Sequence, residues 1–136
     1  MTEALTRGVH HLGLAVRDHD AAAEFFIEAL GWKEVGRNDD YPCAFVSDGS
    51  ITLTLWRVKD PGTAIGFDRR ANIGLHHLAL AVPDEPALQA TFERVSAHPG
   101  VTVEFAPGPF RPGSENLHFI VAMADGIRLE FAARSR

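Results

Sequence analysis

The sequence predicts an α+β protein that contains two copies of a βαβββ module in tandem. Three observations support this fold class. The first is an internal repeat, since GVHHLGLAV at residues 8–16 returns as GLHHLALAV at residues 74–82. The second is that an amphipathic helix pattern follows each copy, and the third is that three strand-like runs follow each helix pattern. We therefore expect modules over 8–58 and 74–133, with the whole chain, 1–136, forming a single domain.

Local signals place the elements of each module in order. After the first repeated strand, Asp18 is suited to cap a helix and Gly31 to end it. After the second, Asp84 is suited to cap a helix that has Pro86 in its first turn, and Pro99-Gly100 is expected to end it. The strand-like runs that follow are WKEVGR, CAFVSD and ITLTLWRV in the first module and VTVEF, NLHFIVAM and IRLEFAA in the second.

Turns and one long loop connect these elements. Asp48-Gly49 and Asp125-Gly126 are typical turn dipeptides before the last strand of each module. The segment 59–73, KDPGTAIGFDRRANI, is expected to be a linker that reaches across a cleft or to another subunit. Its arginines, Arg69 and Arg70, are expected to be solvated loop charges.

The composition excludes several classes of function. A formal net charge of −5 argues against nucleic-acid binding, which needs a basic surface. No apolar run approaches the length of a membrane span, and the start of the sequence lacks the apolar stretch of a signal peptide. The single cysteine, Cys43, excludes an internal disulfide and is expected to be a small buried residue. A cytoplasmic location, with no membrane partner, is the resulting expectation.

Alternation along the strands places one histidine of each module beside small residues. Bulky aliphatic residues occupy every second position of each repeated strand, and we expect this face to pack on the helix. His11 and His77 then share the opposite face with glycine and alanine, which leaves room for a cleft. His10 and His76 point the other way, where a surface or structural role is expected.

The last strand of the second module adds a carboxylate, Glu130, to the same face, and superposing the modules places Thr54 at the equivalent position. Two imidazoles and one carboxylate suit a divalent transition metal and leave coordination positions open for substrate and water. His11, His77 and Glu130 are therefore candidate metal ligands. The alternative is that the histidines are core residues retained after duplication and that Glu130 is a solvated strand residue.

Other side chains on this face are candidates for substrate binding. Arg128 either anchors a substrate carboxylate or pairs with a neighbouring acid and holds it in place. Trp56 is either the floor of an aromatic substrate site or a core aromatic residue. The segment 106–114, APGPFRPGS, is either a loop over the cleft, with Phe110 and Arg111 as gate residues, or a surface connection.

The motifs HHLGLAVRD, HHLALAVPD and DGIRLEFA resemble those of the vicinal oxygen chelate (VOC) superfamily, the glyoxalase, bleomycin-resistance and extradiol dioxygenase group. The resemblance extends over about residues 8 to 133. It implies a glyoxalase-like paired βαβββ fold with a cupped mixed β-sheet, and a homodimer. It also implies that His11, His77 and Glu130 bind a divalent metal (Fe, Mn, Ni, Co or Zn) that chelates neighbouring oxygens of a small-molecule substrate.

Within this superfamily, the leading prediction is a metal-dependent glyoxalase-like lyase or isomerase with Thr54, His118 and Arg128 as catalytic residues. Glyoxalases usually carry Glu or Gln where this chain has Thr54, which cannot take a proton from carbon but can bind substrate or a metal-bound water. The first alternative is an extradiol-type ring-cleaving dioxygenase with Fe(II), although the tyrosine of that family is Ile120 here. His118 is then the candidate acid or base, unless it is a plain strand residue. The second alternative is a metal-independent protein that sequesters a drug or other ligand.

Overall fold

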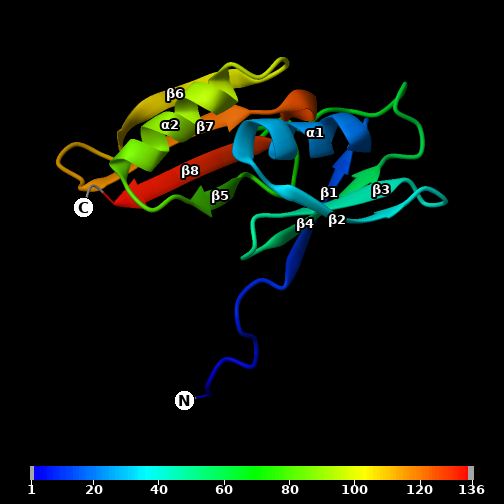
Figure 1. Ribbon diagram of the computed structural model, residues 1–136, viewed down its shortest axis with the longest axis horizontal. Helices are drawn as coiled ribbons and strands as arrows, with labels where there is room; N and C mark the ends of the chain where they lie inside the picture. The colour runs from blue at the N-terminus through cyan, green and yellow to red at the C-terminus, as the bar shows by residue number, and fades with distance from the viewer. Residues whose placement is uncertain (1, 135–136) are drawn as a thin grey trace. The chain divides into compact units, whose positions relative to one another are not determined.

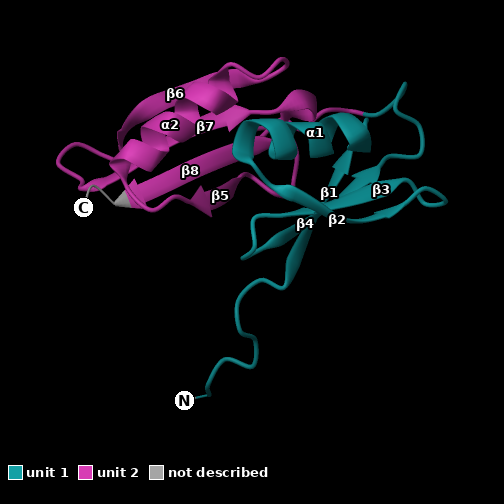
Figure 2. Cartoon of the chain, viewed as in Figure 1, with its two compact units in different colours: residues 1–64 teal, residues 65–136 magenta. Residues whose placement is uncertain are grey.

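The computed structural model describes residues 2–134, and the chain divides into two compact units, Met1–Ala64 and Ile65–Arg136 (Figures 1 and 2). The first unit contains β1 (His11–Val16), α1 (His19–Leu30), β2 (Lys33–Asn38), β3 (Cys43–Ser47) and β4 (Thr52–Arg57). The second contains β5 (Leu78–Ala81), α2 (Glu85–Ser96), β6 (Thr102–Pro109), β7 (Asn116–Ala122), a short turn of 3₁₀ helix (Ala124–Gly126) and β8 (Arg128–Arg134). Both units therefore follow the βαβββ order, and the predicted α+β fold class is confirmed.

Each unit folds around a four-stranded mixed sheet, with strand orders β1-β4-β3-β2 and β5-β8-β7-β6. The first strand of each unit pairs in parallel with the last, and the other pairs are antiparallel. Gly13 lies opposite Thr54 in the first sheet, and Ala79 lies opposite Glu130 in the second. Because Gly13 and Ala79 are equivalent in the repeat, Thr54 holds in the first sheet the position that Glu130 holds in the second.

Helix α1 begins and ends at the residues that the sequence predicts. The Asp18 carboxylate accepts a hydrogen bond from the Ala21 N–H over 3.0 Å, which satisfies one of the unpaired donors of the first turn. Gly31 takes the left-handed conformation at φ 74° and donates its N–H to the Ile27 carbonyl. The buried residues of the helix lie on one stripe: Ala22, Ala23, Phe25, Phe26 and Ala29.

Helix α2 begins as predicted but ends earlier than expected. The Asp84 carboxylate accepts from the Ala87 N–H over 2.9 Å, with Pro86 in the first turn. The helix stops at Ser96 rather than at Pro99-Gly100. The proline ring disfavours helical backbone at the residue before it, so the chain leaves the helix ahead of Pro99.

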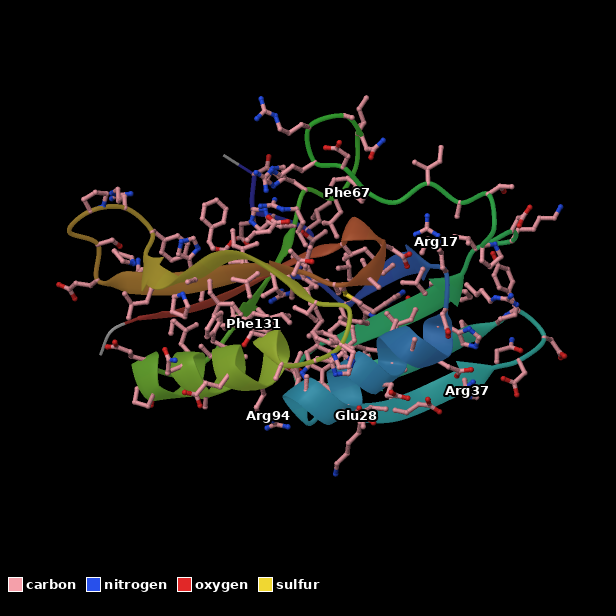
Figure 3. The ribbon with its side chains drawn as sticks, turned by 90° about the horizontal axis from the view of Figure 1, so that it is seen from above. Arg17, Glu28, Arg37, Phe67, Arg94 and Phe131 are labelled. Carbon is pink, nitrogen blue, oxygen red and sulfur yellow. The ribbon has the colours of Figure 1, made fainter. Side chains whose placement is uncertain are left out.

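The two faces of each sheet differ as the alternation predicts. In β1, Leu14 and Val16 are buried whereas His11 and Ala15 are exposed, and β5 follows the same alternation. In β8, Leu129 and Phe131 belong to the core, and Figure 3 shows Phe131 between the sheet and α2. The faces that carry the candidate site residues are therefore the faces that the helices leave open.

Residues from 65 onward, within the segment expected to be a linker, belong to the second unit. The Phe67 N–H donates to the Asp125 carbonyl over 2.7 Å, and Figure 3 shows Phe67 on the side of the sheet away from α2. Arg69 is exposed, as expected of a loop charge, and it is also paired, because its Nη1 lies 2.7 Å from Oε1 of Glu104. The backbone of this loop is therefore held by the turn before β8, and its Arg69 side chain by Glu104 of β6.

The close packing of this loop on the turn Ala124–Gly126 leads to a first prediction. Gly126 has φ 79°, and a Cβ atom there would overlap the carbonyl oxygen of Phe67. Gly126→Ala is therefore expected to lower the free energy of unfolding by about 3 kcal/mol, through backbone strain together with the collision. Gly113→Ala is the matched control, because Gly113 has φ 84° but open space around it, so only strain of about 1 kcal/mol applies. Urea denaturation measures the free energy of unfolding of both variants. Equal decreases in this free energy would contradict close packing of the loop on the turn.

Candidate functional site

The open face of the second sheet carries a buried carboxylate, Glu130, which is only 6% exposed. Its Oε1 lies 3.0 Å from Nε2 of His77, and its Oε2 lies 2.7 Å from Nδ1 of His118. An ionised carboxylate only accepts hydrogen bonds, so each contact requires a proton on the facing imidazole nitrogen or a cation shared by both groups. The carboxylate is thus held from two sides by imidazoles.

A second histidine and an arginine fix the orientation of His77. Nδ1 of His76 lies 2.8 Å from Nδ1 of His77 and 3.0 Å from Nη1 of Arg128, which also donates to the His76 carbonyl over 3.2 Å. Because a guanidinium only donates, Nδ1 of His76 is an acceptor, and Nδ1 of His77 is the donor between the rings. Desolvation and then the positive charge of Arg128 lower the pKa of His76, which favours the neutral form of this ring. The Nε2 atom of His77 is left directed at Glu130.

Arg128 pairs with an acid, and that acid is Glu104. Arg128 is 5% exposed, and its Nε donates to Oε1 of Glu104 over 2.8 Å. Arg69 donates to the same oxygen. Our sequence reasoning missed Glu104 because strand β6 has register shifts on both sides of Phe105, so simple alternation does not place its neighbours on a face. The feature of the sequence that could have pointed to Glu104 is a charged carboxylate in the interior of a predicted strand.

An aromatic ring covers the other imidazole of the cluster. The rings of Phe110 and His118 stack with centroids 4.2 Å apart and planes 16° from parallel, and the His118 side chain is 17% exposed. Beside them is a pocket of about 430 Å³. Its lining residues are Ala81, Val82, Pro83, Phe110, Asn116, Ala132 and Ala133. Arg111, the other expected gate residue, is exposed in the connection between β6 and β7.

The open face of the first sheet has a different character. Thr54 is buried, and its hydroxyl accepts a hydrogen bond from Nε1 of Trp56 over 2.8 Å. Trp56 in turn contacts the rings of Tyr41 and Phe45, with centroids 5.1 and 5.8 Å away. His11 is exposed, with Nδ1 2.9 Å from Nδ1 of His10, the same ring contact that His76 and His77 make. The first sheet therefore presents an aromatic surface and one imidazole.

The donor atoms on these faces fit a divalent transition metal in their chemistry. Within residues 2–134, no three His, Cys, Asp or Glu side chains are arranged as a group that could hold a metal ion. The second unit brings together two of the three expected ligands, since His77 and Glu130 are in contact. His11 lies in the first unit. Imidazole nitrogen and carboxylate oxygen are both ligand types that such ions prefer.

Two βαβββ units define a duplicated α+β protein, with His11 at the start of β1, His77 directly before β5 and Glu130 on β8. The chain belongs to the Glyoxalase/Bleomycin resistance protein/Dioxygenase superfamily, whose family model matches residues 8–131. The suspected VOC relationship is thereby confirmed. Among curated protein sequences, none matches the chain.

Solved structures show the same fold. A glyoxylase/bleomycin resistance protein/dioxygenase domain from Frankia sp. EAN1pec is 28% identical, with a TM-score of 0.77 over 96% of this chain and 94% of that one. A genomically encoded fosfomycin resistance protein from Listeria monocytogenes is 17% identical, with a TM-score of 0.72 over 96% of both chains. A lactoylglutathione lyase from Agrobacterium tumefaciens is 18% identical, with a TM-score of 0.69 over 96% of both. No helix in the described part of the chain has the length and apolar character needed to cross a membrane.

Proposed function

We propose that this chain is a metal-dependent lyase or isomerase of the glyoxalase type, acting on a small substrate with two neighbouring oxygen atoms. The observation that carries the proposal is the buried Glu130 carboxylate, which contacts His77 and His118 on the open face of the second sheet. His11, His77 and Glu130 are the proposed ligands of Fe, Mn, Ni, Co or Zn. Such an ion, when bound, supplies Lewis-acid stabilisation of negative charge on the substrate oxygens.

His118 is the proposed general base. Its Nδ1 faces Oε2 of Glu130, which orients the ring and leaves Nε2 to accept a proton from a substrate carbon. The same Nε2 then returns the proton to the neighbouring atom, which completes an isomerisation without net loss of a proton. Stacking on Phe110 limits the rotation of the imidazole. A base held by a carboxylate in this way is a common catalytic arrangement.

Substrate binding is proposed to involve both open faces. Phe110 and the pocket beside it suit an apolar substituent. Trp56 offers a half-buried aromatic surface, and the Thr54 hydroxyl beside it can hydrogen-bond a substrate oxygen or a metal-bound water. Arg111 is proposed to act with Phe110 as a gate. The superfamily also supports a homodimer, for which light scattering is the direct measurement, and a cytoplasmic location.

A second candidate function is an extradiol-type ring-cleaving dioxygenase with Fe(II). Its support is the combination of one carboxylate, Glu130, with two histidines, His11 and His77, together with His118, whose Nδ1 lies 2.7 Å from that carboxylate. Ile120 pairs directly with Glu130 across β7 and β8 and offers no acid or base.

Metal content, measured by mass spectrometry on untagged protein purified once in air and once anaerobically, tests the proposal. Stoichiometric nickel, cobalt, zinc or manganese is the expected result, to be followed by a screen of thiol adducts and acyl thioesters. Stoichiometric iron that is lost or oxidised in air would instead favour the dioxygenase, with catechols as the first substrates. Protein that holds no metal and takes none up on titration would overturn both and leave a metal-independent sequestering protein.

A further inference from the structure

A second pocket, of about 370 Å³, opens in the second unit at the other end of β8 from Phe110. Its lining residues are Phe67, Asp68, Arg69, Arg70, Glu104, Ala122, Gly126 and Arg128. All of them lie in the unit Ile65–Arg136, so the pocket is complete within one compact unit.

The lining of this pocket carries an excess of positive charge. Arg69 and Arg128 share a single carboxylate oxygen, Oε1 of Glu104, at 2.7 and 2.8 Å. One carboxylate therefore compensates two guanidinium groups. Three arginines and two acids line the pocket, in a chain whose formal net charge is −5. A concentration of cations in an acidic protein attracts small anions to this place.

Anchoring the loop does not by itself account for these arginines. The loop is already held by the hydrogen bond from Phe67 to Asp125 and by its close packing on Gly126. Within the loop, the Asp68 N–H donates to Oδ1 of Asn72 over 2.6 Å, and the Asn72 N–H donates to the Asp68 carbonyl over 2.8 Å. Two guanidiniums converging on one carboxylate at the wall of a hollow are better suited to recognise a further oxyanion, because each presents several N–H groups in a fixed plane.

The pocket is close to the candidate reaction centre. Arg128 precedes Glu130 by two residues on the same face of β8, which is about 6.5 Å along a strand. Its Nη1 also contacts His76, the neighbour of the proposed ligand His77. An anionic group seated against Arg128 would thus leave the rest of a small molecule within reach of Glu130.

We propose that this pocket binds an anionic group, a carboxylate or a phosphate, on the substrate, and that Arg69 and Arg128 are the residues that recognise it. The identification of the bound molecule as the substrate rests on the proposed function. The existence of the anion site rests only on the second unit. Without a bound anion, the Glu104 carboxylate accepts hydrogen bonds from Arg69 and Arg128. It therefore competes with an incoming anion and weakens its binding.

Titration of the full-length protein with inorganic phosphate and, separately, with acetate tests this proposal. The readout is the shift of the backbone amide signals of residues 67–70 and 126–128 in nuclear magnetic resonance spectra. Saturable shifts are expected with at least one anion. Arg69→Ala is expected to weaken binding about tenfold, because it removes a charge-assisted donor. Lys33→Ala, which removes an exposed positive charge from β2, is the control and is expected to change binding less than about twofold.

Glu104→Gln separates recognition from a structural role. If the arginines bind an anion, removing the competing carboxylate is expected to tighten binding about fivefold. If Arg69, Glu104 and Arg128 only hold the loop in place, Glu104→Gln is expected to weaken any amide shift that the anion causes. Should Glu104→Gln fail to fold, as judged by circular dichroism, the comparison of Arg69→Ala with Lys33→Ala decides. Absence of saturable shifts with both anions, or equal binding by Arg69→Ala and the wild type, would overturn the proposal.

The two anions distinguish the ligand class, and two further variants separate this proposal from the proposed function. Binding of phosphate alone assigns a phosphate-bearing ligand, and binding of acetate alone assigns a carboxylate. His77→Ala and Glu130→Gln are expected to lose metal but to keep saturable anion binding, since neither residue lines the pocket. A protein that binds the anion but no metal therefore refutes only the proposed function.

Discussion

Glu130→Gln and His77→Ala are each expected to reduce bound metal from about one equivalent per chain to less than a tenth of that. The amide of glutamine is neutral and binds a divalent cation far more weakly than a carboxylate, and alanine at position 77 removes a nitrogen ligand outright. Loss of one ligand from a set of three leaves too few donors to retain the ion through dialysis. Mass spectrometry of the dialysed variants measures the effect, with circular dichroism to establish that each is folded.

His98→Gln is the matched control for these variants. His98 lies in the turn after α2, in the same unit as His77, and it is not among the proposed ligands. Its substitution is expected to leave the metal content at the wild-type level. Wild-type occupancy in folded Glu130→Gln or His77→Ala would show that the ion is held elsewhere.

Mixing two variants that each lack one proposed ligand shows whether the ligands come from one chain or from two. His11→Ala and His77→Ala each lack a different ligand. If a metal site takes His11 from one chain and His77 from its partner, a mixed dimer has one complete site, and mixing restores part of the metal content. If the ligands come from a single chain, mixing restores none. Dimers must first be dissociated and reassembled together for the comparison to be valid.

Phe119→Ala is expected to lower the free energy of unfolding by about 3–5 kcal/mol, the largest effect on stability that we predict. Phe119 is fully buried and stacks on Phe131 with centroids 4.8 Å apart, while Phe92 of α2 meets its edge at 5.2 Å. Removing the ring therefore opens a cavity between α2 and the sheet that carries Glu130. Urea denaturation provides the measurement.

Phe105→Ala is the control for this substitution. Phe105 belongs to the same sheet but is half exposed, so its removal is expected to cost less than about 1 kcal/mol. If the two variants lose a comparable free energy of unfolding, the ring of Phe119 is not central to the core of the second unit.

The fold of this chain was accessible from sequence because its signals are local and occur twice. Alternation with a period of two placed Leu14 and Leu80 in the core, and capping residues such as Asp18 and Asp84 marked the helix starts. The same alternation put Glu130 on the open face of its sheet, where the structure has it in contact with His77.

The charged network beside the candidate site was not accessible in this way. It joins a loop residue, Arg69, to Glu104 in an irregular strand and to Arg128 in a regular one. Such contacts depend on how far the loop folds back over the sheet, and neither periodicity nor composition specifies that. The pairing of Arg69 was not predicted for this reason, whereas the expectation that Arg128 either binds a ligand or pairs with an acid left room for the observed pair.

The two tryptophans lie in different environments, so the intrinsic fluorescence of the chain can report on each of them. Trp32 is buried against Phe26, whereas Trp56 is half buried on the open face, with its indole N–H bound to Thr54. Indole emission shifts to longer wavelength as its surroundings become wetter, so Trp56 is expected to emit at a longer wavelength than Trp32. Trp32→Phe would leave one indole, that of Trp56 on the open face of the first sheet, so that collisional quenching and energy transfer to an aromatic ligand can be followed without any label.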